Sequence, residues 1–125
     1  MTRPSESASP EAIDLAERLS RFEAHWSPRT VGSFNGHDLM LVKASGEFVR
    51  HSHPDTDDFF HVLQGRLTIE MDAGDVTLGP GEVYVVPKGV EHRPVAHGEV
   101  HMLLIEPAGT PNTGDPETAV RKTTL

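Results

Sequence analysis

The segment Arg50–Gly65, RHSHPDTDDFFHVLQG, places three histidines and three aspartates around the start of an apolar, strand-like run. In a β-strand, residues two positions apart point to the same face, so His51 and His53 are expected to project together. Two imidazoles arranged in this way can serve as neighbouring ligands of one metal ion. A lone His-x-His pair also fits a polar surface strand, so the pair by itself leaves both interpretations open.

Composition excludes several classes of function. A chain of 125 residues forms one domain with a single core. The formal net charge of −8 and the scattered basic residues argue against a nucleic-acid-binding surface. The absence of cysteine excludes disulfides, thiolate metal ligands and a cysteine nucleophile. The sequence shows neither a signal peptide nor an apolar run long enough to span a membrane, so we expect a cytoplasmic protein without membrane partners.

The chain divides into three regions by composition. Residues 1–28 are expected to form a polar tail and a helix at about 10–25, with Ser9 as the N-cap. Residues 29–106 alternate short strand-like runs with turn residues, which is typical of an all-β sandwich or barrel. Residues 107–125 are rich in Gly, Pro and Thr and are expected to form an extended tail.

Within the β region, several local expectations matter for the site. Asn35–Gly36 is a strong hairpin signal between two strand-like runs. Residues 47–53, EFVRHSH, are expected to form the strand that carries the histidine pair. The run 100–106, VHMLLIE, is expected to be the last strand, with His97 in the turn before it.

Two segments of the β region carry a regular spacing of glycine, proline, histidine and one acidic residue. In the first, four residues separate His53 from Asp58, and six more separate Asp58 from a glycine. In the second, the order is glycine, five residues, Pro-x-Gly, two residues and then His92. The residues that form the two patterns are Gly46, His51, His53, Asp58 and Gly65, followed by Gly81, Pro87, Gly89 and His92.

These two segments resemble the paired motifs of the cupin superfamily, and the resemblance runs from Gly46 to Ala96. It implies a double-stranded β-helix, or jelly-roll barrel, with flanking strands from about 29 to 106 and a short N-terminal helix. The sequence departs from the family pattern at two places. Asp58 stands where the first motif has glutamate, and Ala96 stands where the second has asparagine.

The resemblance further implies a divalent transition metal held by His51, His53, Asp58 and His92. Imidazole and carboxylate ligands suit Fe, Mn, Co, Ni, Cu or Zn, and the ligand types do not choose among them. Aspartate is one methylene shorter than glutamate, so Asp58 is expected to reach the metal directly or through a water molecule. Asp57 is expected to point to the opposite face.

Two functions remain open at this point. The first is a metal-dependent cupin acting on a small molecule that chelates the metal, as an oxygenase, lyase or isomerase. A sugar-modifying epimerase or isomerase is a variant for which no catalytic set can be named, and Glu47 is the best available candidate for a general base. The second is a non-catalytic cupin that binds a metal or a small ligand. Apolar residues on both strand faces predict a homodimer.

The other histidines are expected to lie outside the site. His61 differs in parity from Asp58 and should face away from the barrel axis. His25 is expected at a helix end, where a cation favours the helix dipole, and His37 follows the Asn-Gly turn. His101 could line the barrel, because it begins the strand that is expected to return past the metal.

Overall fold

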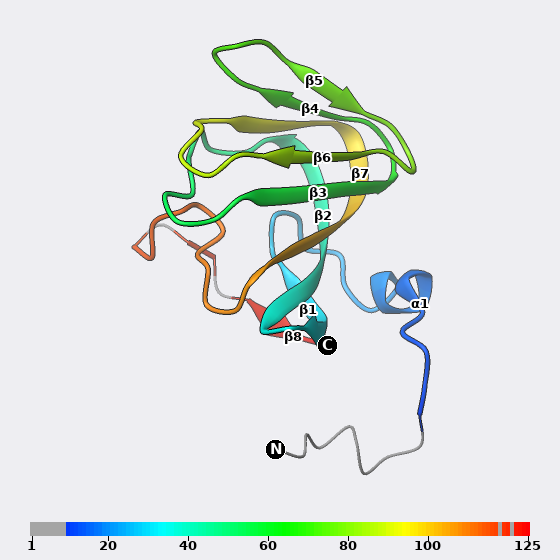
Figure 1. The fold of residues 1–125 in the computed structure, drawn as a ribbon. Coiled ribbons are helices and arrows are strands. Elements are labelled where there is room, and N and C mark those ends of the chain that lie inside the picture. Colours follow the sequence, from blue (N-terminus) through cyan, green and yellow to red (C-terminus); the bar gives the residue numbers. More distant parts are fainter. Residues whose placement is uncertain (1–9, 118, 121) are drawn as a thin grey trace.

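Eight β-strands and one short helix make up the part of the chain that this computed structural model describes, residues 10–117, 119–120 and 122–125. Figure 1 shows their arrangement, which is almost entirely β, as predicted. In chain order the elements are α1 (Leu15–Leu19), β1 (Arg29–Phe34), β2 (His37–Glu47), β3 (Asp58–Gln64), β4 (Leu67–Glu70), β5 (Val76–Leu78), β6 (Val83–Val86), β7 (Arg93–Pro107) and β8 (Thr123–Thr124).

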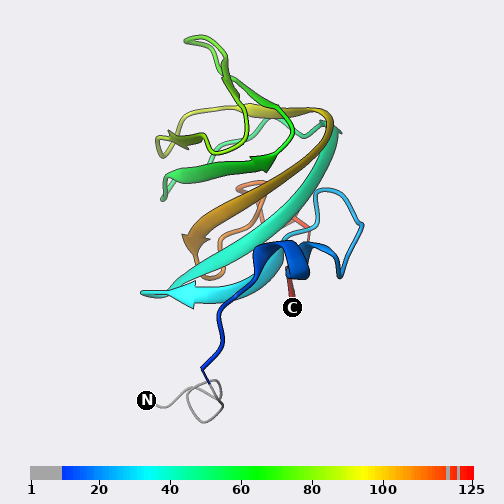
Figure 2. The same cartoon turned by 90° about the vertical axis from the view of Figure 1, so that its right-hand side faces the viewer.

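Strand β7 organises the sheet, whose main path runs β5-β4-β7-β2-β1-β8. One edge of β7 pairs with β2 over nearly its whole length, from His37↔Pro107 to Glu47↔Val95. Its other edge pairs first with β4 and then with β3, which in turn pairs with β6. Figure 2 shows the β2–β7 pair curving from the β4–β5 hairpin down to β1, so that the sheet bends around its contents as in a jelly-roll barrel.

The prediction of a turn at His97 was wrong, because β7 is continuous from Arg93 to Pro107. The chain bends within the strand at Gly98, where a positive φ of 78° is accessible to glycine. Pairing with β4 holds the first part of the strand, and His97 donates its backbone N–H to the carbonyl of Arg66. The expected strand at 100–106 is therefore the second half of a longer one.

The barrel interior is filled by alternate residues of these strands. On β3 the inward positions Phe60 and Val62 are almost completely buried, and on β4 the same holds for Leu67 and Ile69. The buried members of this core are Val42, Ala44, Phe60, Val62, Leu67, Ile69, Leu78, Val86, Ala96, Val100 and Met102. The period-two burial is the pattern expected of strands with one face toward a core.

The N-terminal helix is shorter than predicted. It spans Leu15–Leu19, and its N-cap is Asp14, whose carboxylate accepts the N–H of Glu17 at 3.2 Å. The expected N-cap, Ser9, lies outside the described residues. The helix cannot continue to residue 25, because the chain there pairs with β2: His25 forms a β-bridge with Lys43.

The apolar face of the helical region does cover the sheet, as expected. Leu15, Leu19 and Phe22 pack with Val31 and Leu41 in a second cluster on the other side of the β1–β2 pair from the main core. Trp26 leaves this face through a positive φ of 56° and packs against the main core instead. No helix among the described residues has the length and apolar character needed to cross a membrane.

The C-terminal segment, expected to be an extended tail, folds back onto the barrel in its described part. Strand β8 lies parallel to β1, and the backbone N–H of Leu125 donates to the carbonyl of Thr30 at 2.9 Å. Leu125 also packs against the second apolar cluster. These pairings satisfy backbone groups of β1 that would otherwise form an open sheet edge.

Candidate metal centre

The two histidines of the opening segment lie on irregular backbone rather than on the predicted strand. Strand β2 ends at Glu47, and His51 makes only an isolated β-bridge with His92, with N–H···O distances of 3.0 and 2.9 Å. The strand at 47–53 was therefore a wrong prediction, although the rings still come together. The ring centroids of His51 and His53 are 5.0 Å apart, and the two planes are nearly perpendicular.

The structure brings all four expected ligands into one buried cluster. One ligand atom from each of His51, His53, Asp58 and His92 lies within 4.8 Å of all the others. Asp58 is the first residue of β3, and its Oδ2 lies 2.9 Å from Nε2 of His92 and 3.3 Å from Nε2 of His53. Asp58 therefore reaches the centre of the cluster despite its shorter side chain.

Hydrogen bonds to the backbone orient two of the imidazoles. Nδ1 of His51 donates to the carbonyl of Val49, and Nδ1 of His92 donates to the carbonyl of Val90, both at 2.9 Å. A carbonyl can only accept, so in each neutral ring the proton lies on Nδ1 and the lone pair on Nε2. Backbone partners of this kind fix the tautomer of metal-binding histidines.

This donor arrangement fits a metal ion. With the Nδ1 proton of His92 committed to Val90, its Nε2 lone pair faces the carboxylate of Asp58 at 2.9 Å. Two lone pairs at that distance require a cation between them, either an extra proton or a metal. In addition, Nδ1 of His53 is buried and has no hydrogen-bond partner among the described residues. Three imidazoles and one carboxylate form a typical transition-metal donor set.

The electrostatics of the cluster favour ionised Asp58 beside neutral His51. Burial, reinforced by the neighbouring imidazoles, lowers the pKa of His51 to about 4. Burial also opposes the charge on Asp58, but hydrogen bonds and charge interactions with His53 and His92 outweigh it and lower the Asp58 pKa. For His53 the carboxylate of Asp58 outweighs burial and raises the pKa. Neutral imidazole with carboxylate is the ligating state.

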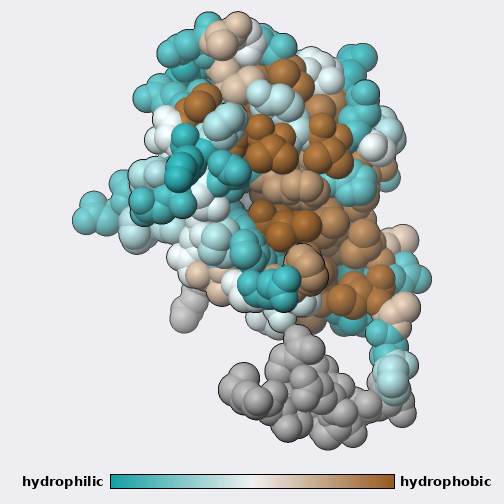
Figure 3. Space-filling view, viewed as in Figure 1, coloured by the Kyte–Doolittle hydropathy of each residue, from teal (hydrophilic) through white to brown (hydrophobic). Residues whose placement is uncertain are grey.

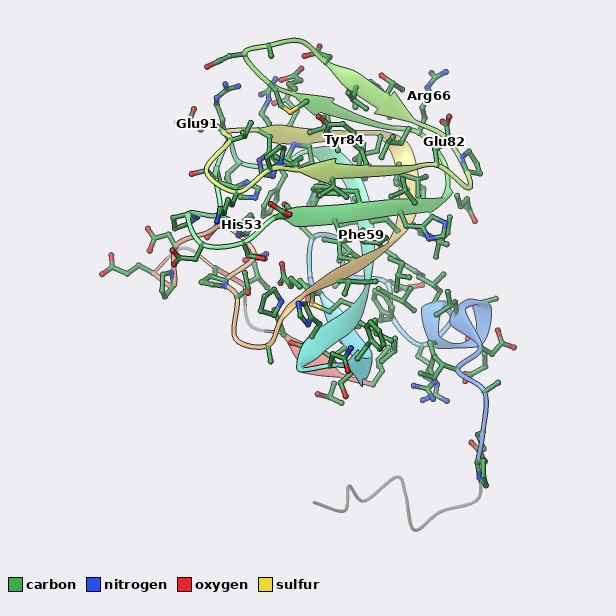
Figure 4. All side chains as sticks on the ribbon, viewed as in Figure 1. His53, Phe59, Arg66, Glu82, Tyr84 and Glu91 are labelled. Atoms are coloured by element: carbon green, nitrogen blue, oxygen red, sulfur yellow. The ribbon has the colours of Figure 1, made fainter. Side chains whose placement is uncertain are left out.

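Several residues considered from the sequence lie outside the cluster. Glu47, the candidate general base, is exposed and pairs with Arg93 at 3.0 Å, so this suggestion was wrong. Asp57 points away, as predicted, and accepts the backbone N–H of Lys88. His61 lies at an outward position of β3, as its parity predicts. Figure 4 shows His53 and Glu91 at one end of the barrel, with Arg66 and Glu82 at the other.

Two further histidines meet on the surface instead of at the centre. His25, beyond the helix rather than at its end, pairs with Glu99 at 2.7 Å. His101 pairs with the second oxygen of the same carboxylate at 2.9 Å and does not reach the metal cluster. This pairing lowers the pKa of Glu99 against the opposing effect of burial.

A largely apolar cavity adjoins the cluster. It measures about 430 Å³, counting the part open to solvent. The rings of Trp26 and Phe48 stack at 4.8 Å in its wall, and Phe48 meets His51 edge-on at 5.4 Å. The remaining lining residues are Pro28, Met40, Val42, His53, Asp58, Phe60, Pro94, Met102, Leu104, Glu106 and Asn112.

Glu106 is a cavity residue that the sequence analysis did not identify. It is 3% exposed, and Lys122 Nζ lies 2.9 Å from its Oε1. Burial raises the pKa of Glu106, while the charge of Lys122 opposes this rise. The sequence carried only a partial signal: Glu106 shares strand parity with Met102 and Leu104, but Leu103 and Ile105 make the opposite face equally apolar, so parity did not identify the inward face.

Comparison with known proteins places this chain in a family. Residues 38–106 match the Cupin_2 family, which is described as a cupin domain. The chain belongs to this cupin family. This agrees with the resemblance seen in the two sequence motifs and with the jelly-roll architecture.

Individual relatives differ in sequence identity and in the share of the chain that they cover. The uncharacterized protein YdbB of Bacillus subtilis is 32% identical over 95 residues, which cover 75% of this cupin and 81% of YdbB. A solved cupin-2 domain protein from Shewanella frigidimarina is 46% identical with a TM-score of 0.75, covering 76% of this chain and 93% of that one. A 3-hydroxyanthranilate 3,4-dioxygenase of Meyerozyma guilliermondii is 28% identical over 75 residues, 57% of this cupin but only 44% of the dioxygenase.

Proposed function

We propose that this cupin binds a divalent transition metal through His51, His53, Asp58 and His92 and acts on a small molecule bound beside it. The reaction belongs to the oxygenase, lyase or isomerase type. The observation that carries the proposal is the convergence of three imidazoles and one carboxylate in a buried cluster. The cluster also borders a cavity whose walls are otherwise mainly apolar.

The chain's own residues prepare the cluster for this role. The backbone carbonyls of Val49 and Val90 hold His51 and His92 with their Nε2 atoms inward. Asp58 is ionised because its pKa is lowered, and its negative charge attracts a cation into the cluster. A bound divalent metal would act there as a Lewis acid toward an oxygen-bearing ligand, and Fe, Mn, Ni, Co, Cu and Zn all suit these ligands.

The cavity supports a small ligand with an apolar body. Trp26 and Phe48 offer stacked aromatic surface, and Phe60 and Met102 add further apolar contacts. Aromatic and thioether side chains bind flat rings well. The similarity to a 3-hydroxyanthranilate 3,4-dioxygenase, a protein named for an aromatic substrate, favours the oxygenase among the three reaction types.

The metal itself is the first thing to test. Protein purified without a nickel column should contain a stoichiometric transition metal by elemental analysis, or should take one up from Fe(II), Mn(II), Ni(II), Co(II), Cu(II) or Zn(II). Absence of binding by all six would contradict the proposal. Metal binding without turnover of any hydroxylated aromatic would contradict the oxygenase type, and metal binding without turnover of any small molecule would identify a non-catalytic metal- or ligand-binding cupin.

We also propose that the protein is a homodimer through the outer face of β6, β3 and β7. Val85 pairs with Phe59, and Phe59 pairs with Ile105, so these outward side chains lie in one row across three strands. Figure 3 shows the apolar surface that this row belongs to, and Val83 and Val85 are 49% and 43% exposed. A second copy would cover this apolar surface with an identical one.

Light scattering tests the dimer with a matched pair of variants. Val85→Glu should convert the dimer to a monomer, because it buries a charge at the proposed interface. Val120→Glu is the control, since this valine is also 43% exposed but lies on the C-terminal segment. A monomeric wild type at micromolar concentration, or a dimer unaffected by Val85→Glu, would contradict the proposal.

A further inference from the structure

Glu106 is a buried carboxylate that the metal cluster does not use. It lies on β7 one residue beyond the pair Phe59↔Ile105, which places it across from Asp58, the residue before Phe59. Both residues line the same cavity. A carboxylate that is 3% exposed is costly to bury, so a specific partner is expected for it.

Lys122 satisfies only part of this requirement. Its Nζ lies 2.9 Å from Oε1 of Glu106, close enough for an ion pair. Apart from this ion pair, no group among the described residues hydrogen-bonds to Oε1. Lys122 is shared with a second carboxylate, because its Nζ also lies 3.5 Å from Oδ2 of Asp38.

We propose that Glu106 accepts a hydrogen bond from a hydroxyl group of the small molecule bound in the cavity. Glu106 is thus a ligand-binding residue of the cavity wall that lies beside Asp58 and is not itself one of the proposed metal ligands. This inference rests on the proposed function, since it assigns one contact of the molecule that the metal cluster binds.

The charges around the cavity narrow the class of ligand. A divalent cation at the cluster would meet two carboxylates, Asp58 and Glu106, and one ammonium, Lys122. Together with Asp38, which shares Lys122, these charges sum to zero, so the cavity does not require a ligand of high net charge. A hydroxylated aromatic that reaches the metal through one oxygen and keeps another hydroxyl as a donor fits this balance and matches the aromatic walls.

A purely structural role for Glu106 is the competing explanation. In that case the pair with Lys122 would only fasten the C-terminal segment, which also packs closely on the histidine loop where Gly114 meets the backbone of Ser52. Removing Glu106 would then change stability without changing how the protein discriminates among ligands. The two explanations differ in this discrimination.

The experiment uses Zn(II)-loaded full-length protein with two probes, pyrocatechol and its monomethyl ether 2-methoxyphenol. Zn(II) avoids redox chemistry. Trp26 is the chain's single tryptophan and lines the cavity, so its fluorescence reports occupancy. The variants are Glu106→Gln, which keeps the shape but removes the charge, and Asp38→Asn, which removes the other carboxylate near Lys122 but does not line the cavity.

Wild type and Asp38→Asn should prefer pyrocatechol over the ether, and Glu106→Gln should reduce this preference about tenfold, the effect of a hydrogen bond to a charged group. Zn(II) affinity, measured separately with a competing chelator, should be unchanged in both variants. An unchanged preference in Glu106→Gln, or an equal loss in Asp38→Asn, would overturn the inference. Failure of wild type to bind Zn(II) or any other tested transition metal would instead overturn the proposed function.

Discussion

The two ends of the barrel solve different problems. At the end that carries Arg66 and Glu82 in Figure 4, tight turns join the strands, and Gly65 and Gly81 adopt positive φ of 84° within them. At the end that carries His53, long irregular segments replace tight turns and bury four ionisable side chains. The turn end is held by backbone geometry and packing alone. The histidine end buries polar atoms whose charge and lone pairs a bound cation would balance.

The largest expected effect is loss of the cation at the histidine end. His51→Ala or His92→Ala should each abolish the gain in melting temperature that wild type shows with a transition metal, because each removes an oriented Nε2 ligand. At a metal concentration a thousand times Kd the wild-type gain corresponds to about 4 kcal/mol. Differential scanning calorimetry measures it.

His61→Ala is the control for these variants, because His61 lies at an outward position of the same region. It should keep the full metal-dependent gain. If the metal-dependent gain in melting temperature survives in His51→Ala or disappears in His61→Ala, the metal does not bind at the histidine end through His51.

The next effect concerns the metal-free protein and its pH dependence. The folded-state pKa of His51 is lowered to about 4, so between that value and 6.5 the unfolded chain binds a proton that the folded chain does not. His51 therefore contributes stability above pH 6.5, and up to about 3 kcal/mol of it is lost as pH falls toward 4. His51→Gln should flatten this part of the profile in urea denaturation with EDTA present.

The contribution of His53 to stability should change with pH in the opposite direction to that of His51, and it should do so at higher pH. Its folded-state pKa is raised by Asp58 against the effect of burial, so its contribution is full below pH 6.5 and is lost as pH rises through the raised value. A His51→Gln profile with the same acid slope as wild type would show that His51 does not cause the acid loss.

The turn end should respond to shape rather than to charge or metal. A Cβ at Gly65 would collide with the backbone carbonyl of Glu99, and its φ of 84° disfavours other residues. Gly65→Ala should therefore cost about 3 kcal/mol with or without metal. Gly81→Ala is the matched control, with the same φ and nothing within 4 Å of its Cβ, and should cost about 1 kcal/mol. Equal losses of stability in Gly65→Ala and Gly81→Ala would show that the contact with the Glu99 carbonyl is not what makes Gly65 necessary.

The smallest effect is expected from lengthening the carboxylate. Asp58 Oδ2 already lies 2.9 Å from His92 Nε2, so the reach of aspartate is sufficient. Asp58→Glu should keep most of the metal-dependent gain in melting temperature, with the extra methylene taken up in the adjoining cavity. Asp58→Ala should reduce the gain clearly, since the site loses its charge. Similar gains in wild type and Asp58→Ala would show that Asp58 is not a ligand.

The sequence predicted the metal cluster better than the backbone that carries it. His51, His53, Asp58 and His92 could be named together because the two segments that carry them resemble the paired motifs of the cupin superfamily. The strand assumed at 47–53 was wrong, because the irregular path of that segment depends on contacts with distant residues such as Pro94 and His92. The predicted C-terminal end of the helix near residue 25 was wrong for the same reason, since the β-bridge between His25 and Lys43 overrides helical propensity there.

The pair of Glu106 and Lys122 could not be predicted from spacing at all. Sixteen positions separate the two residues along a segment rich in turn residues, and no motif joins them. Their contact exists because β8 returns to β1 and brings Lys122 under the barrel. The sequence showed only that Glu106 shares strand parity with Met102 and Leu104.

Strand β7 has a consequence for how the protein is made. Three strands, β2, β3 and β4, all pair with β7, which begins at Arg93, after all four proposed metal ligands have been synthesised. On the ribosome, β2 and β3 therefore cannot pair with β7 until residue 107 has emerged from the exit tunnel. Such distant pairing slows folding. Barrel closure consequently waits for β7 to emerge, and the nascent chain exposes its strand edges until then.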